Sequence, residues 1–509
     1  MAFDSNDIIL QSEQLLNLLQ DSLECTEYKF YNEIIAKSIK SLNEPCRLAV
    51  TGRVSAGKSS LVNVLLGEDY AKVGITETTA TINIFKYGNP PSMDKPILCE
   101  YNDGTSEWVS KKDVDLLNGS SEEVIKKSES IKDLVFYVQN DILRNTILID
   151  TPGIDSVTGS DGDAHQQLTE LFLGLRNKHE KQTIELSNNA DAVILLLGDV
   201  SHESDADFIN KFLENRGGNS SVNTIGILSQ IDLTDERIEN RYKNSKDRYD
   251  RLSRYINCVV PISAGLKRFL PTVAQAKKIK SVISKVKSKE LLNTLLLRSE
   301  KIYLMKNIPG IDLTLEERLQ IYDKGVTPFR CFAVFCNYLY SYDVNEAISL
   351  IDGISGINDL KVILEEQFFS RSYTIKAELA IRQGLKIIWN ILNCNTNSEN
   401  NENNVDDADR LGENLFSIQN KLEQILSNTV SNNNYYRSLM LLGCNQELFE
   451  PNEIEELKSL FSANNSDYEQ ERLDYWYTEM NNSTVEIRRQ IAREAYNKYT
   501  DNAFKTFQL

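Results

Sequence analysis

One stretch constrains the fold of this chain more than any other: residues 52–59, GRVSAGKS, which fit the pattern G-x-x-x-x-G-K-S. They follow a short apolar run, residues 46–52, and open an apolar segment, residues 59–66, that is typical of a helix. A glycine-rich turn between a buried strand and a helix lets successive backbone N–H groups surround a phosphate. The N-terminus of the helix adds partial positive charge. We therefore predict a phosphate-binding loop in a strand–helix domain.

The residue types of this loop predict a nucleoside triphosphate and Mg²⁺. The side chain of Lys58 is expected to reach the β- and γ-phosphates, and the hydroxyl of Ser59 to bind Mg²⁺. Asp150 and Gly153 follow another apolar run, residues 145–149. Here the carboxylate can hold a Mg²⁺-bound water and the Gly153 N–H can contact the γ-phosphate. The residues predicted to contact phosphate in the loop are Gly52, Arg53, Val54, Ser55, Ala56, Gly57, Lys58, Ser59 and Ser60.

A threonine-rich segment between these two motifs is a candidate switch. Residues 74–80, GITETTA, precede a predicted strand, where a loop threonine can supply a second hydroxyl to Mg²⁺. Thr79, Thr78 and Thr76 all qualify, and local spacing does not decide among them. The other interpretation is that these threonines begin the next strand.

Two further segments are candidates for selecting the base. Ser229-Gln230-Ile231-Asp232 follows the apolar run 224–228, and the two carboxylate oxygens of Asp232 could bind the N1–H and the 2-amine of guanine. A commoner form of this motif is N-K-x-D or T-K-x-D, so Ser229 and Gln230 depart from it. A second segment after another apolar run, 258–262, could place a backbone N–H near guanine O6: Ser263, Ala264 and Gly265. Their order behind the phosphate loop favours GTP over ATP.

The remaining pattern predicts a mixed, mostly parallel sheet with helices on both faces, followed by helices alone. Short apolar runs alternate with helical segments from residue 46 to about 290, and this alternation is typical of an α/β domain. Residues 1–44 and 291–509 carry helical periodicity instead. We expect flexible connectors at two asparagine-rich tracts, 394–407 and 427–434.

Composition limits where the chain acts. The net charge of −18 repels nucleic acid over most of the surface, so we expect no nucleic-acid partner. The start lacks the pattern of a signal peptide, and no apolar run is long enough to cross a membrane. The eight cysteines form no C-x-x-C pair, which favours reduced core thiols. The predicted location is the cytoplasm, or at most the inner face of the cell membrane.

Taken in order, the segments GRVSAGKSS, ETTA, DTPGID, SQID and PISAGL resemble the GTPase domain of the dynamin superfamily, especially bacterial dynamin-like proteins. The resemblance covers roughly residues 46–290, and GRVSAGKSSLVNVLLG is also similar to the mitofusin version of the loop. It selects Thr79 as the switch threonine. It matches Ser55 to a family serine that helps bind a charge-compensating cation. Val54 stands where eukaryotic dynamins have a glutamine that helps to place the attacking water.

The resemblance implies a P-loop GTPase that converts GTP to GDP and phosphate with Mg²⁺. The residues it implies in catalysis are Ser55, Lys58, Thr79 and Gly153, and those on Mg²⁺ are Ser59, Thr79 and Asp150. It also implies three parts: N-terminal helices (1–44), a dynamin-type GTPase domain (45–290) and a helical stalk (291–509). Helices from both chain ends are expected to form one bundle, a coiled-coil-like lever. The expected partners are a homodimer through the GTPase domain or a second dynamin-like chain, with peripheral contact to an anionic membrane.

Two alternatives stay open. A soluble regulatory GTPase would act on a protein partner without lipid, and a GTP-binding scaffold would have negligible turnover, as Val54 allows. Residues 267–289 contain eight basic residues and no acid, so their helix could lie on an anionic bilayer. We favour the plainer interpretation, a last helix of the GTPase domain with its apolar stripe on the sheet. The aromatic run 329–342 likewise favours core over a lipid-inserting tip.

Overall fold

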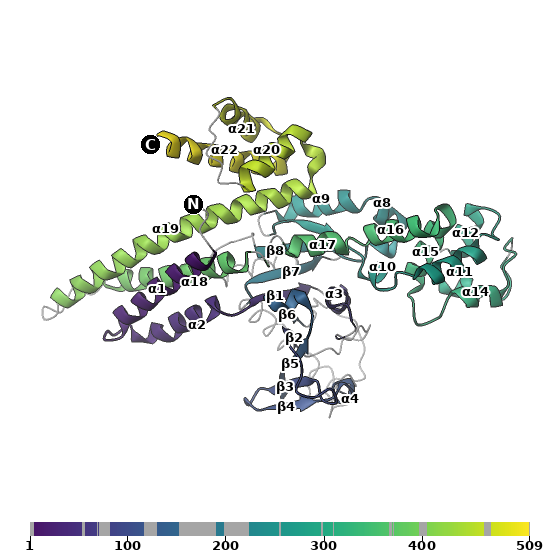
Figure 1. Ribbon diagram of the computed structural model, residues 1–509, viewed down its shortest axis with the longest axis horizontal. Coiled ribbons are helices and arrows are strands. Elements are labelled where there is room, and N and C mark those ends of the chain that lie inside the picture. Colours follow the sequence, from purple (N-terminus) through teal and green to yellow (C-terminus); the bar gives the residue numbers. More distant parts are fainter. Residues whose placement is uncertain are drawn as a thin grey trace, which may run out of the picture.

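The computed structural model shows a central sheet with a long helical bundle on one side and a helical lobe on the other (Figure 1). The structure describes residues 5–52, 56–68, 70, 82–116, 130–151, 190–197, 223–253, 256–296, 299–308, 310–365, 369, 371–395, 405–462 and 470–507.

The sheet has nine strands in the order β4-β3-β5-β2-β6-β1-β7-β8-β9. Strands β6, β1, β7, β8 and β9 run parallel to one another, and β2 is parallel to β5. The pairs β2–β6, β3–β5 and β3–β4 are antiparallel. The predicted mixed, mostly parallel sheet is therefore confirmed. Its bounds are β1 Cys46–Gly52, β2 Ile82–Tyr87, β3 Ile97–Tyr101, β4 Ser106–Val109, β5 Ile131–Val138, β6 Thr146–Asp150, β7 Ala192–Leu197, β8 Thr224–Leu228 and β9 Val259–Pro261.

Successive side chains of the central strands point alternately into two separate apolar clusters. On β7, Val193, Leu195 and Leu197 belong to one cluster, whereas Ile194 and Leu196 belong to the other. Because successive side chains of a strand point to opposite faces, an unbroken apolar strand must be covered on both sides. On one face lie α3 (Lys58–Leu66) and α17 (Ile357–Leu364). On the other lies α9 (Arg241–Leu252). The same apolar cluster continues beyond the sheet into the lobe, where it includes residues of α11 (Val273–Ile283) and α15 (Phe329–Ser341).

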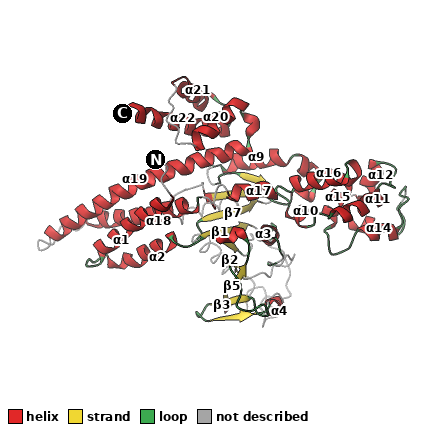
Figure 2. Cartoon of the chain, viewed as in Figure 1, coloured by secondary structure: helices red, strands yellow, loops and turns green. Residues whose placement is uncertain are grey.

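The bundle joins segments from opposite parts of the chain. It consists of α1 (Ser5–Leu23), α2 (Asn32–Leu42), α18 (Ser372–Asn395) and α19 (Val405–Cys444) (Figures 1 and 2). A third apolar cluster fills it, including Leu16, Ile381 and Leu422, each fully buried. The predicted bundle of N-terminal and C-terminal helices is thus confirmed for these four.

The basic segment 267–289 does not present a free apolar stripe. Ile279, Val282 and Ile283 on α11 are buried, and their helix packs on α14 (Leu315–Ile321), α15 and α16 (Val344–Ile354) rather than directly on the sheet. The aromatic run is also core, because Phe332 and Phe335 on α15 are 2% exposed. The lobe is completed by α10 (Ala264–Arg268), α12 (Lys289–Leu296) and α13 (Glu300–Tyr303).

One expected connector is wrong. Residues 427–434 lie inside α19, which runs unbroken for 40 residues. Thr429 is fully buried there and its hydroxyl donates to the Ile425 carbonyl at 2.8 Å, so packing overrides the polar composition. In the other tract, residues 396–404 lie outside the described part of the chain.

The last three helices form a separate cap. They are α20 (Pro451–Ser462), α21 (Gln470–Asn482) and α22 (Glu486–Phe507), and they pack on one another and on the end of α19 nearest the sheet (Figure 1). The hydroxyl of Tyr249 on α9 donates to the amide oxygen of Gln490 at 2.9 Å. These last described helices therefore pack on α9 and on the end of α19, outside the bundle. The hairpin β3–β4 with α4 (Lys111–Leu116), and the short α8 (Asp235–Glu239), complete the fold.

Candidate nucleotide site

The phosphate loop begins where β1 ends, at a glycine that no other residue could replace. Gly52 has φ +149°, and a Cβ there would lie 2.7 Å from the Leu196 carbonyl oxygen. Gly57, with φ +94°, caps α3. Both conformations are ones that side-chain-bearing residues rarely adopt. Lys58 folds back so that its Nζ donates to the Gly52 carbonyl at 3.1 Å, which holds the ammonium at the end of β1.

Ser59 and Asp150 meet at the carboxyl ends of two adjacent parallel strands. The Ser59 hydroxyl donates to Asp150 Oδ2 at 3.1 Å, and Val50 of β1 pairs with Asp150 of β6 in the sheet. Burial raises the pKa of Asp150 to about 6, an effect that Lys58 and Ser59 partly offset. The carboxylate is therefore held in a dry site, opposite a cation.

The donor set at this point fits Mg²⁺. Asp150 Oδ1 is buried and accepts no well-aligned hydrogen bond from a described residue, although the nearby Asn83 side chain on β2 helps to lower the pKa of the carboxyl. A buried, unsatisfied carboxylate oxygen is costly unless something else occupies it. Hydroxyl and carboxylate oxygens are the hard ligands that Mg²⁺ prefers. Ser59 and Asp150 would hold the ion, while Thr79, the third predicted ligand, lies outside the described residues.

Several predicted residues cannot be placed. Ala56 and Ser60 flank Gly57 and Lys58 as expected, at the end of the loop and in the first turn of α3. The other predicted residues lie outside the described part of the chain: Arg53, Val54, Ser55, Thr79 and Gly153. Their roles stay predictions.

Sequence reasoning missed one residue beside the aspartate motif. Thr151 is 3% exposed, and its hydroxyl donates to the Val50 carbonyl at 3.0 Å. Its backbone N–H points to the same oxygen at 3.2 Å. This pair of bonds fastens the end of β6 to β1, so it holds Asp150 opposite the phosphate loop. The sequence offered a signal, since Thr151 is part of the D-T-P-G motif.

The two base-selecting segments lie at the same edge of the sheet, past β8 and β9. Ser229 donates to the Leu197 carbonyl at 3.5 Å, and Ile231 N–H to the Ile262 carbonyl at 3.4 Å. Gln230 has φ +57°, the only positive φ of a non-glycine residue in the described chain. Such strain is uncommon and concentrates at functional turns. Ser263 caps α10 by accepting from Leu266 N–H at 3.0 Å, with Ala264 and Gly265 in its first turn.

Asp232 does not face an open pocket. It is 1% exposed, and its Oδ2 lies 2.7 Å from Arg330 Nε on α15. The thiol of Cys331 is 3.7 Å from the same oxygen. Arg330 and Cys331 of α15 therefore contact the carboxylate at Oδ2. Neither Arg330 nor Cys331 could be found from the sequence, since they lie almost a hundred residues beyond the motif in no recognisable pattern.

Comparison with known proteins places this site in a family. Residues 48–231, roughly a third of the chain, match the dynamin family. Dynamin-like protein 2 of Campylobacter jejuni is 25% identical over 252 residues, 49% of this chain and 36% of that protein. The isoniazid-induced protein IniC of Mycobacterium tuberculosis is 27% identical over 249 residues, 46% of this chain and 45% of that protein. The chain spans less than half the length of these curated relatives.

Among solved structures, a chain from an oligomerised bacterial dynamin pair aligns with 96% of this chain and 95% of its own length. The identity is 13% and the TM-score 0.36, so we draw no argument from this likeness. The matched domain contains the phosphate loop at the end of β1 and the aspartate at the end of β6. On that match, residues 48–231 are similar to the dynamin family, and about half of the chain is similar to a bacterial dynamin-like protein.

Proposed function

We propose that this protein binds GTP with Mg²⁺ and hydrolyses it to GDP and phosphate. One observation carries the proposal: Lys58, Ser59 and Asp150 converge at the carboxyl ends of β1 and β6 inside a dynamin-family domain. Ligands of open α/β sheets bind at this edge. The Lys58 ammonium can bind phosphate, and the buried Asp150 carboxylate can bind a divalent ion.

In this proposal the chain supplies position and charge rather than a covalent intermediate. Lys58 leaves the Gly52 carbonyl for the β- and γ-phosphates, and the backbone N–H groups at the start of α3 donate to phosphate oxygens. Ser59 and Asp150 would hold Mg²⁺, which would supply positive charge to balance the negative charge that builds up on the leaving phosphate. Thr79 and Gly153 are proposed to orient the attacking water, and Ser55 to hold a second cation.

The site is also connected to the bundle. Strand β1 ends at the phosphate loop and begins directly after α2. At that junction Lys376 of α18 is 3% exposed, and its Nζ donates to the carbonyls of Ser41, at 2.5 Å, and Glu44. A shift of β1 relative to α18 must break buried charge-assisted bonds or carry the bundle along. We propose that hydrolysis is coupled in this way to movement of the bundle.

The proposal also covers assembly and membrane contact. We propose that GTPase domains pair, either between identical chains or with a second dynamin-like chain, and that the protein contacts an anionic membrane peripherally. Relatives support this direction: one curated match is a probable transmembrane FZO-like GTPase of Arabidopsis thaliana. In the described part of this chain, none of the helices is long and apolar enough to cross a bilayer.

The test is GTP hydrolysis measured against protein concentration, with and without anionic liposomes. Lys58→Ala removes the phosphate-binding cation, and Lys112→Ala, an exposed lysine of α4, is the matched control. We expect a rate that depends on Lys58 but not on Lys112, rises with concentration and increases further on liposomes. EDTA should abolish the rate, since the proposed ligands bind Mg²⁺.

Other outcomes select the alternatives. A rate that depends on Lys58 yet ignores both concentration and liposomes would favour a soluble regulatory GTPase. Tight GTP binding without phosphate release would favour a scaffold, with Val54 in place of the family glutamine as the cause. Hydrolysis unaffected by Lys58→Ala would overturn the proposed site.

A further inference from the structure

Asn83 lies directly beside the carboxylate that is proposed to bind Mg²⁺. It is the second residue of β2, and it pairs with Asp150, the last residue of β6, across the antiparallel contact between these strands. Residues directly opposite each other on adjacent strands have Cβ atoms only about 4.5 to 5.5 Å apart and project from the same face of the sheet. The side chain of Asn83 therefore leaves the backbone next to that of Asp150.

This face of the sheet is the one that α3 covers. Phe85, two residues after Asn83 on β2, pairs with Leu148 on β6, and both belong to the apolar cluster that includes residues of α3. Because side chains alternate along a strand, Asn83 and Asp150 lie on the same face as this pair. Ser59, whose hydroxyl donates to Asp150, is in the first turn of α3. The amide and the hydroxyl thus approach the carboxylate from two different elements, β2 and α3.

Asn83 is a polar residue in an otherwise apolar part of β2. Its neighbour Ile82 is buried, and Asn83 itself is only 8% exposed. A side-chain amide is costly to bury unless it has hydrogen-bond partners in the protein. An ionised carboxylate only accepts hydrogen bonds, so the amide must donate to it from its NH₂ group. Burial raises the pKa of Asp150, and Asn83 is among the groups that partly offset this rise, as a donor to the carboxylate would.

We propose that Asn83 is a positioning residue of the magnesium site: its amide donates to the Asp150 carboxylate and holds it in the orientation that Mg²⁺ requires. The inference rests on the proposed function, because it concerns the ion that accompanies GTP. Ser59 donates to Oδ2 alone, so a second donor on another element is needed to fix the rotation of the carboxylate. Removal of a group that orients a metal ligand lowers metal affinity by about 10- to 100-fold.

The test compares Asn83→Val with Asn83→Thr in the whole chain. The two introduced side chains have the same shape and both suit a strand, but only Asn83→Thr retains a group that can donate to the carboxylate. The readout is the affinity for a ribose-labelled, fluorescent, non-hydrolysable GTP analogue at a series of free Mg²⁺ concentrations and in EDTA. The Mg²⁺ concentration at half-maximal tightening reports on the metal site, whereas the affinity in EDTA reports on the rest of the nucleotide site.

We expect Asn83→Val to raise this Mg²⁺ midpoint by about tenfold and to leave the affinity in EDTA within about twofold of the wild-type value. Asn83→Thr should keep the midpoint within about threefold of the wild-type value, since a hydroxyl donor replaces the amide. Phe85→Leu is the matched control, because it changes the same face of the same strand away from Asp150. It should lower stability to urea without moving the midpoint.

Three results would overturn the inference: an unchanged midpoint in folded Asn83→Val, equal increases in Asn83→Val and Asn83→Thr, or the same increase in Phe85→Leu. If Asn83→Val does not fold, Asn83→Ala and Asn83→Ser repeat the comparison, because they also differ by one hydroxyl. The same outcomes then decide.

The two proposals fail differently. If GTP binding is independent of Lys58 or of Mg²⁺, the proposed function is wrong and this inference falls with it. If binding depends on both, and Asn83→Val has the wild-type midpoint, only the role of Asn83 is wrong.

Discussion

At the residue scale, the site depends on a few backbone positions that only glycine can occupy. Gly52 at the end of β1 is one, and its place in the G-x-x-x-x-G-K-S pattern made it predictable. Gly356, between α16 and α17, is another. It has φ +66°, and a Cβ would lie 2.1 Å from the Pro261 carbonyl oxygen. Its neighbour Ser355 accepts from Ser263 N–H at 2.9 Å, so this turn also positions the second base-selecting segment.

We predict that Gly356→Ala destabilises the protein by at least about 3 kcal/mol, because it combines backbone strain with a clash against backbone that cannot retreat. Gly353→Ala, three residues earlier in α16, is the matched control. A Cβ there meets nothing within 4 Å, so it should leave stability unchanged or raise it by up to about 1 kcal/mol. Urea unfolding followed by circular dichroism measures both. Equal midpoints for the two variants would contradict the packing described at Pro261.

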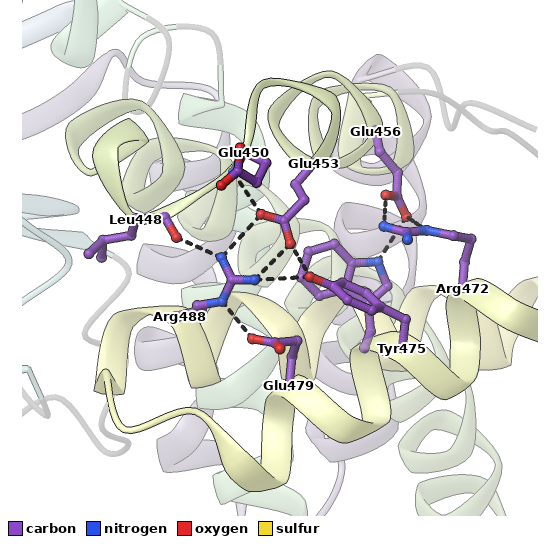
Figure 3. Close-up of polar contacts among 9 residues, drawn as sticks. Leu448, Glu450, Glu453, Glu456, Arg472, Tyr475, Glu479 and Arg488 are labelled. Carbon is purple, nitrogen blue, oxygen red and sulfur yellow. Dashed lines mark hydrogen bonds and ion pairs between the residues drawn. The ribbon is translucent and has the colours of Figure 1, made fainter.

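At the scale of elements, the cap formed by α20–α22 is held by a network of charged and aromatic side chains (Figure 3). Arg488 lies between Glu453, at 2.7 Å, and Glu479, at 2.6 Å. Tyr475 also contacts Glu453 through its hydroxyl. In the same layer the fully buried Trp476 donates from Nε1 to Glu456 at 2.8 Å. These contacts join α20, α21 and α22, and each contact is lost when either of its two side chains is removed.

This network predicts a pH dependence. Burial raises the pKa of Glu453, but hydrogen bonds from Arg488, from the Tyr475 hydroxyl and from the Glu450 N–H outweigh it, so the pKa lies below the ordinary 4.5. A carboxyl whose pKa is lower in the folded than in the unfolded state stabilises the folded state at pH values above the unfolded pKa. This stabilisation is lost as the pH falls through the pKa of the carboxyl in the folded state. The cap should therefore loosen in acid below about pH 4.5, and less steeply in Glu453→Gln. A red shift of Trp476 emission measures this in a Trp108→Phe, Trp389→Phe background, which leaves Trp476 as the only tryptophan.

Removing the cation tests the same network at neutral pH. Arg488→Leu leaves two glutamates without their partner and should destabilise the cap by about 3 kcal/mol. Arg489→Ala, on the next residue, breaks an ion pair with Glu486 whose two side chains are 40% and 44% exposed, and should cost less than about 1 kcal/mol. Urea unfolding monitored at Trp476 compares the two. Similar losses would show that the buried network is not what holds the cap.

At the scale of the whole molecule, the bundle brings together segments that are far apart in sequence. α1 packs on α18 and α19 around Leu16, which is fully buried. Gly384 lets α18 approach α1 closely, since a Cβ at Gly384 would lie 2.8 Å from a Leu16 methyl group. The N-terminal helices are therefore part of the same core as the helices after residue 371.

We predict that Leu16→Ala destabilises the bundle by about 3 kcal/mol, through lost burial and the cavity left behind. Leu18→Ala, two residues on and 50% exposed, is the matched control and should cost less than about 0.5 kcal/mol. Hydrogen exchange across α1, α18 and α19 measures the effect. Faster exchange confined to α1 would contradict a shared core, which should loosen all three helices together.

Features that depend on residues close together in the sequence could be predicted, whereas features that depend on contacts between distant residues could not. The strand, loop and helix around Gly52, and the alternation of side chains along β7, follow from neighbours in the chain, so the α/β sheet and the phosphate loop were predictable. The tract 427–434 was misjudged because its asparagines predict a connector. Buried residues of the tract, such as Thr429, keep it helical. The amino-acid composition does not show which residues are buried.

By itself, then, the sequence predicted a phosphate loop between β1 and α3, the alternation of strands and helices along the chain and the resemblance of this domain to the dynamin family. Only the tertiary structure decided that Asp150 lies buried beside Ser59, that Arg330 lies against Asp232, and that the final helices pack on α9 and the end of α19 rather than lengthen the bundle. The physical reason is that backbone propensity and side-chain periodicity act over a few residues. Contacts such as Arg330 with Asp232 depend on packing between elements that no local pattern encodes.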